Sequence, residues 1–167
     1  ILYLFQAQIT ACTVIHESLR NIGVNDQINK LTMVTLDSIA ETYIKKEKLW
    51  TILETFPLSE NDISEQAILS GYICQALLEN IEWGSDMAKK KLGLASLLHD
   101  VAITNTDLLN IVNITDPAFE KLSEEDKQEF KEHPQKAGEM TDYFSSFQDV
   151  YYIVSEHHEL PGKKGFP

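Results

Sequence analysis

The chain has 167 residues, a formal net charge of −12 and 43% hydrophobic residues. This length allows one domain, or one domain with a helical extension, and the apolar content is enough for a core. The acidic balance disfavours general binding to polymeric nucleic acid or to an anionic membrane surface, because both require clustered Lys and Arg. No apolar run reaches the roughly 18 residues of a membrane span.

The first residues of the chain and its two cysteines indicate whether it carries a secretory leader and whether it resides in a reducing compartment. It begins ILYLFQAQIT without Met, without a preceding basic segment and without a small-residue cleavage site. This pattern favours an internal fragment of a longer protein over a secretory leader. Cys12 and Cys74 form no CxxC pair and lie in apolar helical patterns, so we interpret them as small buried side chains in a reducing cytosol.

Helical periodicity dominates the first part of the chain. A helix is predicted over 2–21, ended by Gly23, and a second runs from about Asp26 towards Trp50. The apolar face of the first helix consists of Phe5, Ile9, Cys12, Ile15 and Leu19. The breaker Phe56-Pro57 predicts a boundary between an N-terminal segment, 1–58, and a domain, 59–167. The N-terminal hairpin is interpreted as a linker or stalk of a regulatory module, or as an ordinary part of a helical bundle.

Shorter helices are predicted after the boundary. They cover 63–83, 87–98, 107–112, 123–133 and 148–159. Ser85 is the expected N-cap of the second of them, and Ser123 with Asp126 resembles a capping box. Pro134 is expected to open a new turn or helix after His133. Strand-like alternation is nowhere sustained, so the sequence predicts an all-α fold.

Four of the five histidines stand in a pattern that indicates a metal site. His99 is followed directly by Asp100, His133 precedes a proline, and His157 and His158 are adjacent. A His-Asp pair offers a nitrogen and a carboxylate to one ion, or a carboxylate that bridges two ions. Two neighbouring histidines on a helix point about 100° apart, so each reaches a different ion or a different side of one pocket. The fifth, His16, is interpreted as a structural or surface residue.

Imidazole and carboxylate together suit Fe, Mn, Zn, Co or Ni. Two such ions roughly 3.5–4 Å apart deprotonate a water and stabilise both oxygens of an in-line displacement at phosphorus. The ordered set therefore predicts a two-metal site for phosphodiester hydrolysis.

Three segments resemble the HD-GYP family of HD-domain phosphohydrolases. They are LGLASLLHDVA, KEHPQKAGEM and EHHELPGKKGFP, which resemble the family's His-Asp signature, its "HP…G" segment and its HHE…GYP signature. The resemblance covers about 62–167. It implies a helical HD-domain bundle whose closing C-terminal helices lie beyond Pro167.

The resemblance also implies a function and a set of ligands. It implies two or three divalent transition-metal ions, Fe or Mn above all, and hydrolysis of the bacterial messenger cyclic di-GMP by a metal-activated hydroxide in the cytoplasm. His99 and Asp100 are the catalytic candidates. The implied metal ligands are His99, Asp100, His133, His157 and His158, with Asp62 as a further candidate.

The sequence departs from the family at positions expected to meet the substrate and at positions where the family has metal ligands. Ile103 stands where the family has a Lys, and Gln66 stands where it has a His. Asp62 occupies a position that is a Glu in three-metal members, although N-capping is the competing interpretation. Phe166 replaces the Tyr of GYP. Lys163, Lys164 and Phe166 are nevertheless the candidate substrate-binding residues.

Three functions remain open from the sequence. The first is a phosphodiesterase acting on a cyclic dinucleotide. The second is a catalytically degenerate module that binds metal, and the messenger as well, for signalling. The third is a broader HD phosphohydrolase, which the GFP loop disfavours. The long N-terminal helices are compatible with a homodimer.

Overall fold

The computed structural model describes residues 2–43, 51–52, 54–59, 61–82, 84–162 and 165–167. Within these ranges the backbone forms helices, turns and loops, and no strand. The predicted all-α fold class is therefore confirmed. None of the described helices combines the length and the apolar character that crossing a bilayer requires.

The chain begins with a helical hairpin. Helix α1 spans Leu2–Asn21 and α2 spans Asp26–Tyr43. Gly23 between them has a φ of 89°, a left-handed conformation that glycine adopts without strain, so its predicted role in ending the first helix is confirmed. The predicted apolar face of α1 is buried, each side chain being at most 5% exposed. The predicted extension of the second helix to Trp50 lies outside the described residues.

Helices α4, Ile63–Leu78, and α5, Asp86–Leu98, follow. Ser85 caps α5 as predicted, because its Oγ accepts the N–H of Ala88 at 3.2 Å. The predicted helix over 63–83 was too long. The chain reverses after Leu78, and a Cβ on Gly84 would lie only 2.0 Å from the Leu78 carbonyl oxygen, so glycine is needed for this close approach.

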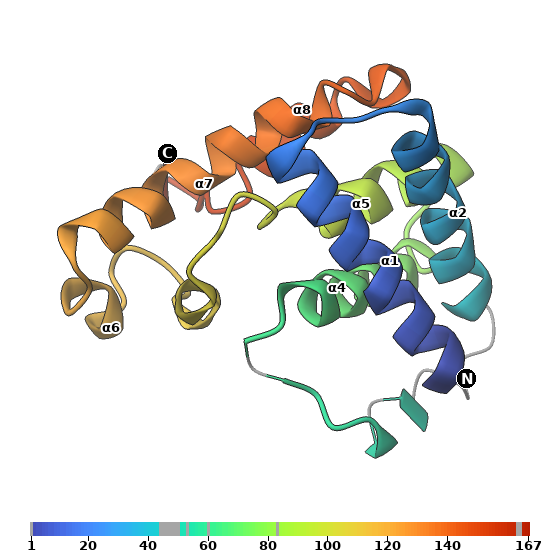
Figure 1. Cartoon of the computed structure of the whole chain (residues 1–167), viewed down its shortest axis with the longest axis horizontal. Helices are drawn as coiled ribbons and strands as arrows, with labels where there is room; N and C mark the ends of the chain where they lie inside the picture. Colours follow the sequence, from blue (N-terminus) through green and yellow to red (C-terminus); the bar gives the residue numbers. More distant parts are fainter. Residues whose placement is uncertain (1, 44–50, 53, 60, 83, 163–164) are drawn as a thin grey trace.

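One hydrophobic core joins the hairpin to the rest of the chain. Helices α1 and α2 pack against α4, and α2 also packs against α5 (Figure 1). Within this core Gln8 of α1 donates its Nε2–H to Ser38 at 2.8 Å and to Thr42 at 3.3 Å, and accepts the hydroxyl of Tyr72. The segments on either side of the predicted boundary at 58/59 therefore share a core and a buried polar network.

The remaining elements extend along one side of this core (Figure 1). They are a 3-10 helix, Thr106–Asn110, helix α6, Pro117–Glu120, helix α7, Glu124–Thr141, a 3-10 turn, Ser145–Phe147, and helix α8, Val150–Ser155. The helix predicted over 107–112 is thus a 3-10 helix, and α6 was not predicted. The last helix is shorter than the predicted 148–159, so His157 and His158 lie in the turn after it.

Helix α7 continues through Pro134, so the predicted break at this residue was wrong. Proline has no N–H and leaves the carbonyl four residues earlier, that of Phe130, without its helical partner. The side chain of His133 supplies the missing donor, because its Nδ1 lies 2.6 Å from the Phe130 oxygen. The same histidine is one of the predicted metal ligands, so the continuity of α7 and the orientation of a ligand depend on one hydrogen bond.

Candidate metal centre

The predicted ligands come from three elements that contact one another. His99 and Asp100 follow α5, His133 lies within α7, and His157 and His158 follow α8. One ligand atom from each of Asp100, His133, His157 and His158 lies within 4.8 Å of the others. The structure therefore brings together residues separated by up to 58 positions along the chain.

The carboxylate of Asp100 lies at the middle of the cluster. Its Oδ1 is 3.2 Å from His133 Nε2 and 3.5 Å from His157 Nε2. Its Oδ2 is 3.2 Å from the Nε2 of His99. The two oxygens thus face different histidines, which is the arrangement expected of a carboxylate that bridges two ions.

Three of the histidines are oriented by the same local hydrogen bond. Each places Nδ1 against the backbone carbonyl three residues earlier: His99 on Ser96 at 3.0 Å, His133 on Phe130 at 2.6 Å and His157 on Val154 at 2.7 Å. A carbonyl only accepts, so Nδ1 carries the proton and donates. In the neutral ring the lone pair is then on Nε2, the atom that faces the cluster.

The spacing of these atoms fits a bound transition-metal ion. His133 Nε2 and His157 Nε2 are 3.3 Å apart, and both face Asp100 Oδ1. Donors about 2.1 Å from one ion lie about 3.0–3.4 Å from each other at octahedral or tetrahedral angles. Lone pairs that converge in this way repel one another unless a proton or a cation lies between them, so the donor set is suited to holding a metal.

The electrostatics of the cluster favour the protonation states in which two residues, Asp100 and His158, can bind metal. Burial opposes ionisation of Asp100, but the neighbouring charge of His99 and hydrogen bonds from the surrounding histidines hold the pKa of its carboxyl well below the usual range. Burial, with the charges of His157 and His133, lowers the pKa of His158 to about 3. Asp100 is therefore anionic and His158 neutral near pH 7, as metal binding requires.

The pKa of His99 is shifted in the opposite direction from that of His158. Burial alone would lower its pKa, but the charge and hydrogen bond of Asp100 and the carbonyl of Ser96 raise it above the usual value. Only the neutral imidazole of His99 can coordinate a metal ion, so an ion on this side of the cluster would compete with the proton and bind more weakly as the pH falls.

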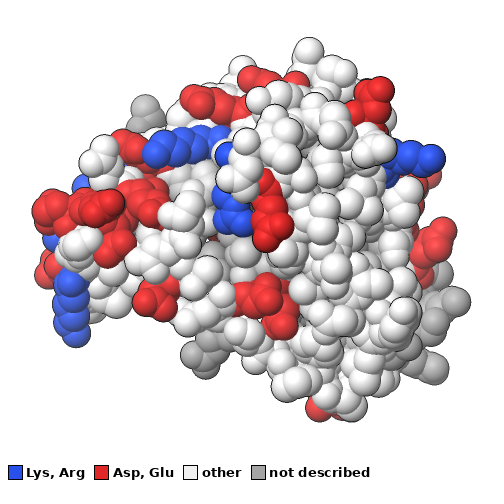
Figure 2. Space-filling view, in the orientation of Figure 1, with Lys and Arg blue, Asp and Glu red and all other residues white. Residues whose placement is uncertain are grey.

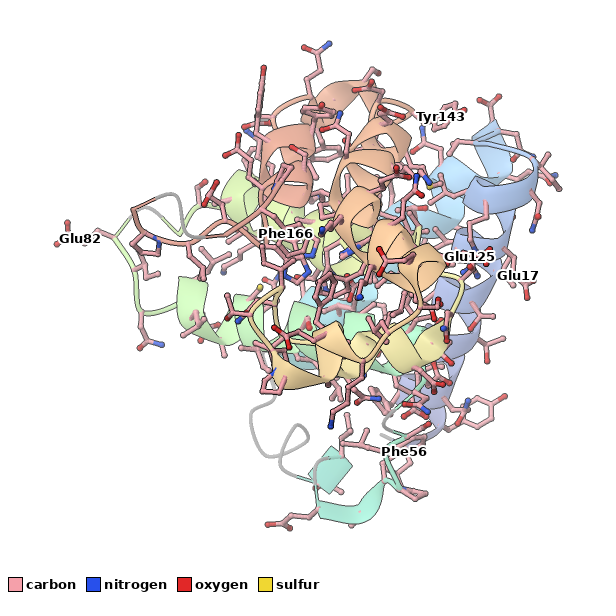
Figure 3. The ribbon with its side chains drawn as sticks, turned by 90° about the vertical axis from the view of Figure 1, so that its left-hand side faces the viewer. Glu17, Phe56, Glu82, Glu125, Tyr143 and Phe166 are labelled. Carbon is pink, nitrogen blue, oxygen red and sulfur yellow. The ribbon has the colours of Figure 1, made fainter. Side chains whose placement is uncertain are left out.

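Phe166 is packed against the cluster. Its side chain is labelled in Figure 3. The ring stacks on His158 with centroids 4.5 Å apart and an interplanar angle of 16°, and its centroid lies 5.2 Å from that of Phe130. Phe166 is only 5% exposed. The structure therefore gives it a role in holding His158, and its predicted contact with substrate stays a prediction. Lys163 and Lys164 lie outside the described residues.

Asp62 caps α4. Its Oδ1 accepts the N–H groups of Ser64 at 2.9 Å and Glu65 at 3.0 Å, so the capping interpretation is confirmed. Among the described residues, the group whose ligand atoms converge does not include Asp62. Its role as a further metal ligand stays a prediction.

A pocket of about 210 Å³ opens on the cluster. It is bounded on one side by His99, Asp100, His157 and His158. The other walls are apolar: Ile103, Leu108, Leu109, Ile111, Val112 and Phe130. No Lys or Arg among the described residues lines it.

The candidate ligands stand out in the sequence, whereas the groups that orient them do not. The carbonyl partners depend on where α5 and α8 end, which the apolar pattern did not fix. One signal was available, because a proline directly after a helical histidine frees the carbonyl three residues before that histidine. The stacking of Phe166 on His158 had no signal in the sequence beyond their shared segment.

Comparison with known protein families, curated proteins and solved structures gives no match to this chain. The chemistry of the cluster therefore carries the functional argument.

Proposed function

We propose that this chain is a metal-dependent phosphodiesterase of the HD-GYP type that hydrolyses a cyclic dinucleotide, with cyclic di-GMP as the expected substrate. The observation that supports this proposal most is the position of Asp100. One of its oxygens faces His133 and His157, and the other faces His99. This arrangement suits two ions that share one carboxylate, and two-metal sites are a common solution for hydrolysis at phosphorus.

Each residue of the cluster has a distinct role in the proposal. Asp100 supplies the negative charge that attracts divalent cations. His133 and His157 present their Nε2 atoms to Asp100 Oδ1, and His99 faces Oδ2. When bound, the ions lower the pKa of a water molecule and take up negative charge that develops on the phosphoryl oxygens. The mixed nitrogen and oxygen donors suit Fe or Mn, and accept Zn, Ni or Co.

The pocket supports a second candidate function. Ile103 stands at the position where the family has a phosphate-contacting Lys, and it is 2% exposed within an apolar cluster with Leu108 and Phe166. Such a wall favours a module that binds metal, and a messenger as well, without efficient turnover. This degenerate module would pass a conformational signal rather than release a product.

One assay separates the two functions. The chain is purified anaerobically, loaded with Fe(II) or Mn(II) and incubated with cyclic di-GMP, and products are separated by chromatography. Linear dinucleotide or GMP supports the phosphodiesterase. Binding of the messenger without product would overturn the enzymatic proposal and support the degenerate module.

The His157→Ala/His158→Ala double variant serves as the matched control. It should lose metal and product together while keeping the helical circular dichroism of the wild type. Product formed at the wild-type rate by this variant would mean that the activity comes from a contaminating enzyme or from another site.

A further inference from the structure

Helix α1 contacts the chain on both sides of the His99-Asp100 pair. His16 Nε2 lies 2.6 Å from the carbonyl oxygen of Leu97, and Arg20 Nη1 donates to the carbonyl oxygen of Ile103 at 3.1 Å. His16 and Arg20 are four residues apart and therefore lie on one face of α1. Two side chains of one helix thus hold the backbone just before and just after the proposed ligands.

The Leu97 carbonyl needs such a partner because α5 ends there. In a continuing helix it would accept the N–H of Val101, but that N–H donates to Leu98 at 3.1 Å instead. The last carbonyls of a helix have no partner within the helix and require one from outside. His16 supplies it, and thereby acts as a cap on the end of α5 that carries His99.

The imidazole of His16 is specifically suited to this contact. The side chain is 1% exposed, and since Nε2 donates to Leu97, its Nδ1 is left as an acceptor with no partner among the described residues. An unpaired buried acceptor disfavours folding. An apolar side chain at this position would leave no unpaired acceptor. What the imidazole adds, in return, is the hydrogen bond to the Leu97 carbonyl.

We propose that α1 positions the His99-Asp100 pair for metal binding, with His16 as the main positioning residue and Arg20 as the second. The proposal rests on the metal centre described under the proposed function. Asp100 Oδ1 lies 3.2 Å from His133 of α7 and 3.5 Å from His157 after α8, so a small rotation of the α5 end changes both distances. Loss of either carbonyl contact from α1 is therefore transmitted to the metal centre.

Cobalt(II) is the probe for the test, because its visible absorption reports both affinity and ligand geometry. His16→Leu removes the donor and keeps an apolar side chain, whereas His16→Gln keeps an N–H near the position of Nε2. Leu19→Ala is the packing control, because it loosens α1 in the core and leaves both carbonyl contacts in place. Arg20→Met tests the second contact at a less buried position, should His16→Leu not fold.

We expect His16→Leu to bind cobalt at least about 10-fold more weakly, the scale of losing a group that orients a ligand, with a changed absorption band. Arg20→Met should show a smaller change in the same direction. His16→Gln should recover most of the affinity, and Leu19→Ala should lower the melting temperature while its cobalt spectrum stays unchanged. Wild-type affinity and spectrum in folded His16→Leu and Arg20→Met would overturn the proposal, as would an equal loss in Leu19→Ala.

Hydrogen exchange on the metal-free protein separates this proposal from the proposed function. The N–H groups of His99, Val101 and Ile103, which bond to Ala95, Leu98 and Asp100, should exchange faster in His16→Leu than in Leu19→Ala. Equal exchange in the two variants would overturn the positioning role. Failure of the wild type to bind cobalt would overturn the metal centre instead, whatever the exchange rates are.

Discussion

At the scale of single residues, the candidate metal centre is oriented by backbone carbonyls. His99, His133 and His157 each donate Nδ1–H to the carbonyl three residues earlier, which leaves Nε2 free to face Asp100. Because the partner is so near in sequence, each candidate ligand is oriented within its own helix or turn. The meeting of α5, α7 and α8, with the end of α5 held by α1, then assembles the site.

Asp62 offers a test that separates two roles of one carboxylate. Asparagine caps a helix about as well as aspartate does, but it is a far weaker metal ligand. We therefore expect Asp62→Asn to keep both the melting temperature and the metal content of the wild type. Asp62→Ala should destabilise the protein by about 1 kcal/mol through loss of the cap, as measured by denaturant unfolding.

The metal content of the Asp62→Asn variant decides whether Asp62 is only a cap. If Asp62→Asn lost metal while its stability stayed unchanged, the carboxylate would be a ligand as well as a cap. A three-metal centre would then describe the site better.

At the scale of elements, Pro134 links the stability of α7 to the site. Proline within a helix removes one backbone hydrogen bond, and the freed Phe130 carbonyl is taken by His133. Helix formation and ligand orientation therefore compete for the same acceptor. The bond from His133 explains how a residue that disfavours helices is accommodated in the middle of the 18-residue helix α7.

Pro134→Ala should change stability and metal affinity in opposite directions. Alanine restores the N–H at residue 134 and is favoured over proline in a helix interior by up to about 3 kcal/mol, so the melting temperature should rise. The restored N–H competes for the Phe130 oxygen and loosens the orientation of His133, so cobalt affinity should fall several-fold. Thermal denaturation and a competition titration measure the two effects. A gain in both properties would show that the His133–Phe130 bond does not orient the ligand.

The sequence predicts those elements whose boundaries and faces depend on residues close together in the chain. Helix α1, its apolar face, Gly23 and the Ser85 cap were all predicted, because each depends on a few adjacent residues. The reversal after Leu78 depends on close contact with Gly84, and the continuity of α7 depends on the His133 side chain. The first feature depends on a tertiary contact, and the second depends on a side-chain hydrogen-bond donor that replaces a backbone N–H. The periodicity of apolar residues indicates neither of them.

The ligands of the site were predictable for a different reason. His-Asp, His-Pro and His-His are adjacent pairs that stand out in the sequence, and the structure brings all of them to one place. The apolar pocket wall could not be predicted, because it forms where the loop from Ile103 to Val112 folds back over the cluster.

At the scale of the whole molecule, acidic side chains gather at the end formed by α6 and the start of α7 (Figure 2). The start of α7 alone carries Glu124, Glu125, Asp126, Glu129 and Glu132. This negative field, together with the net charge of −12, attracts divalent cations and repels phosphates. Binding of an anionic dinucleotide should therefore depend on bound metal and strengthen with ionic strength, within the range that screens this repulsion.

The stability of the metal-free protein should depend on His16 in acid. Burial lowers the pKa of His16 to about 4, below its usual value of 6.5, so the unfolded chain binds a proton more readily. The contribution of neutral His16 to the free energy of unfolding is fully present above pH 6.5. It decreases by about 3 kcal/mol as the pH falls towards 4, for a pKa shift of this size. The unfolding free energy of the wild type should therefore fall more steeply across this range than that of His16→Leu.

Comparison of these two proteins isolates His16 from its neighbours. His158, whose pKa is also lowered, and His99 and Asp100 titrate in both proteins, so their contributions largely cancel. Parallel pH profiles for the two proteins would mean that His16 is not buried as a neutral donor to Leu97.

If the cluster around Asp100 holds metal, as we claim, the number of ions bound per chain shows it. The wild type and Asp100→Asn are purified anaerobically with Fe(II) or Mn(II) and analysed by mass spectrometry of the bound elements, with circular dichroism to verify folding. We predict about two ions per wild-type chain, as a two-metal site requires, and a large loss in Asp100→Asn at unchanged helicity. A folded wild type that retains no ion, or an Asp100→Asn variant that retains as many as the wild type, would contradict the claim.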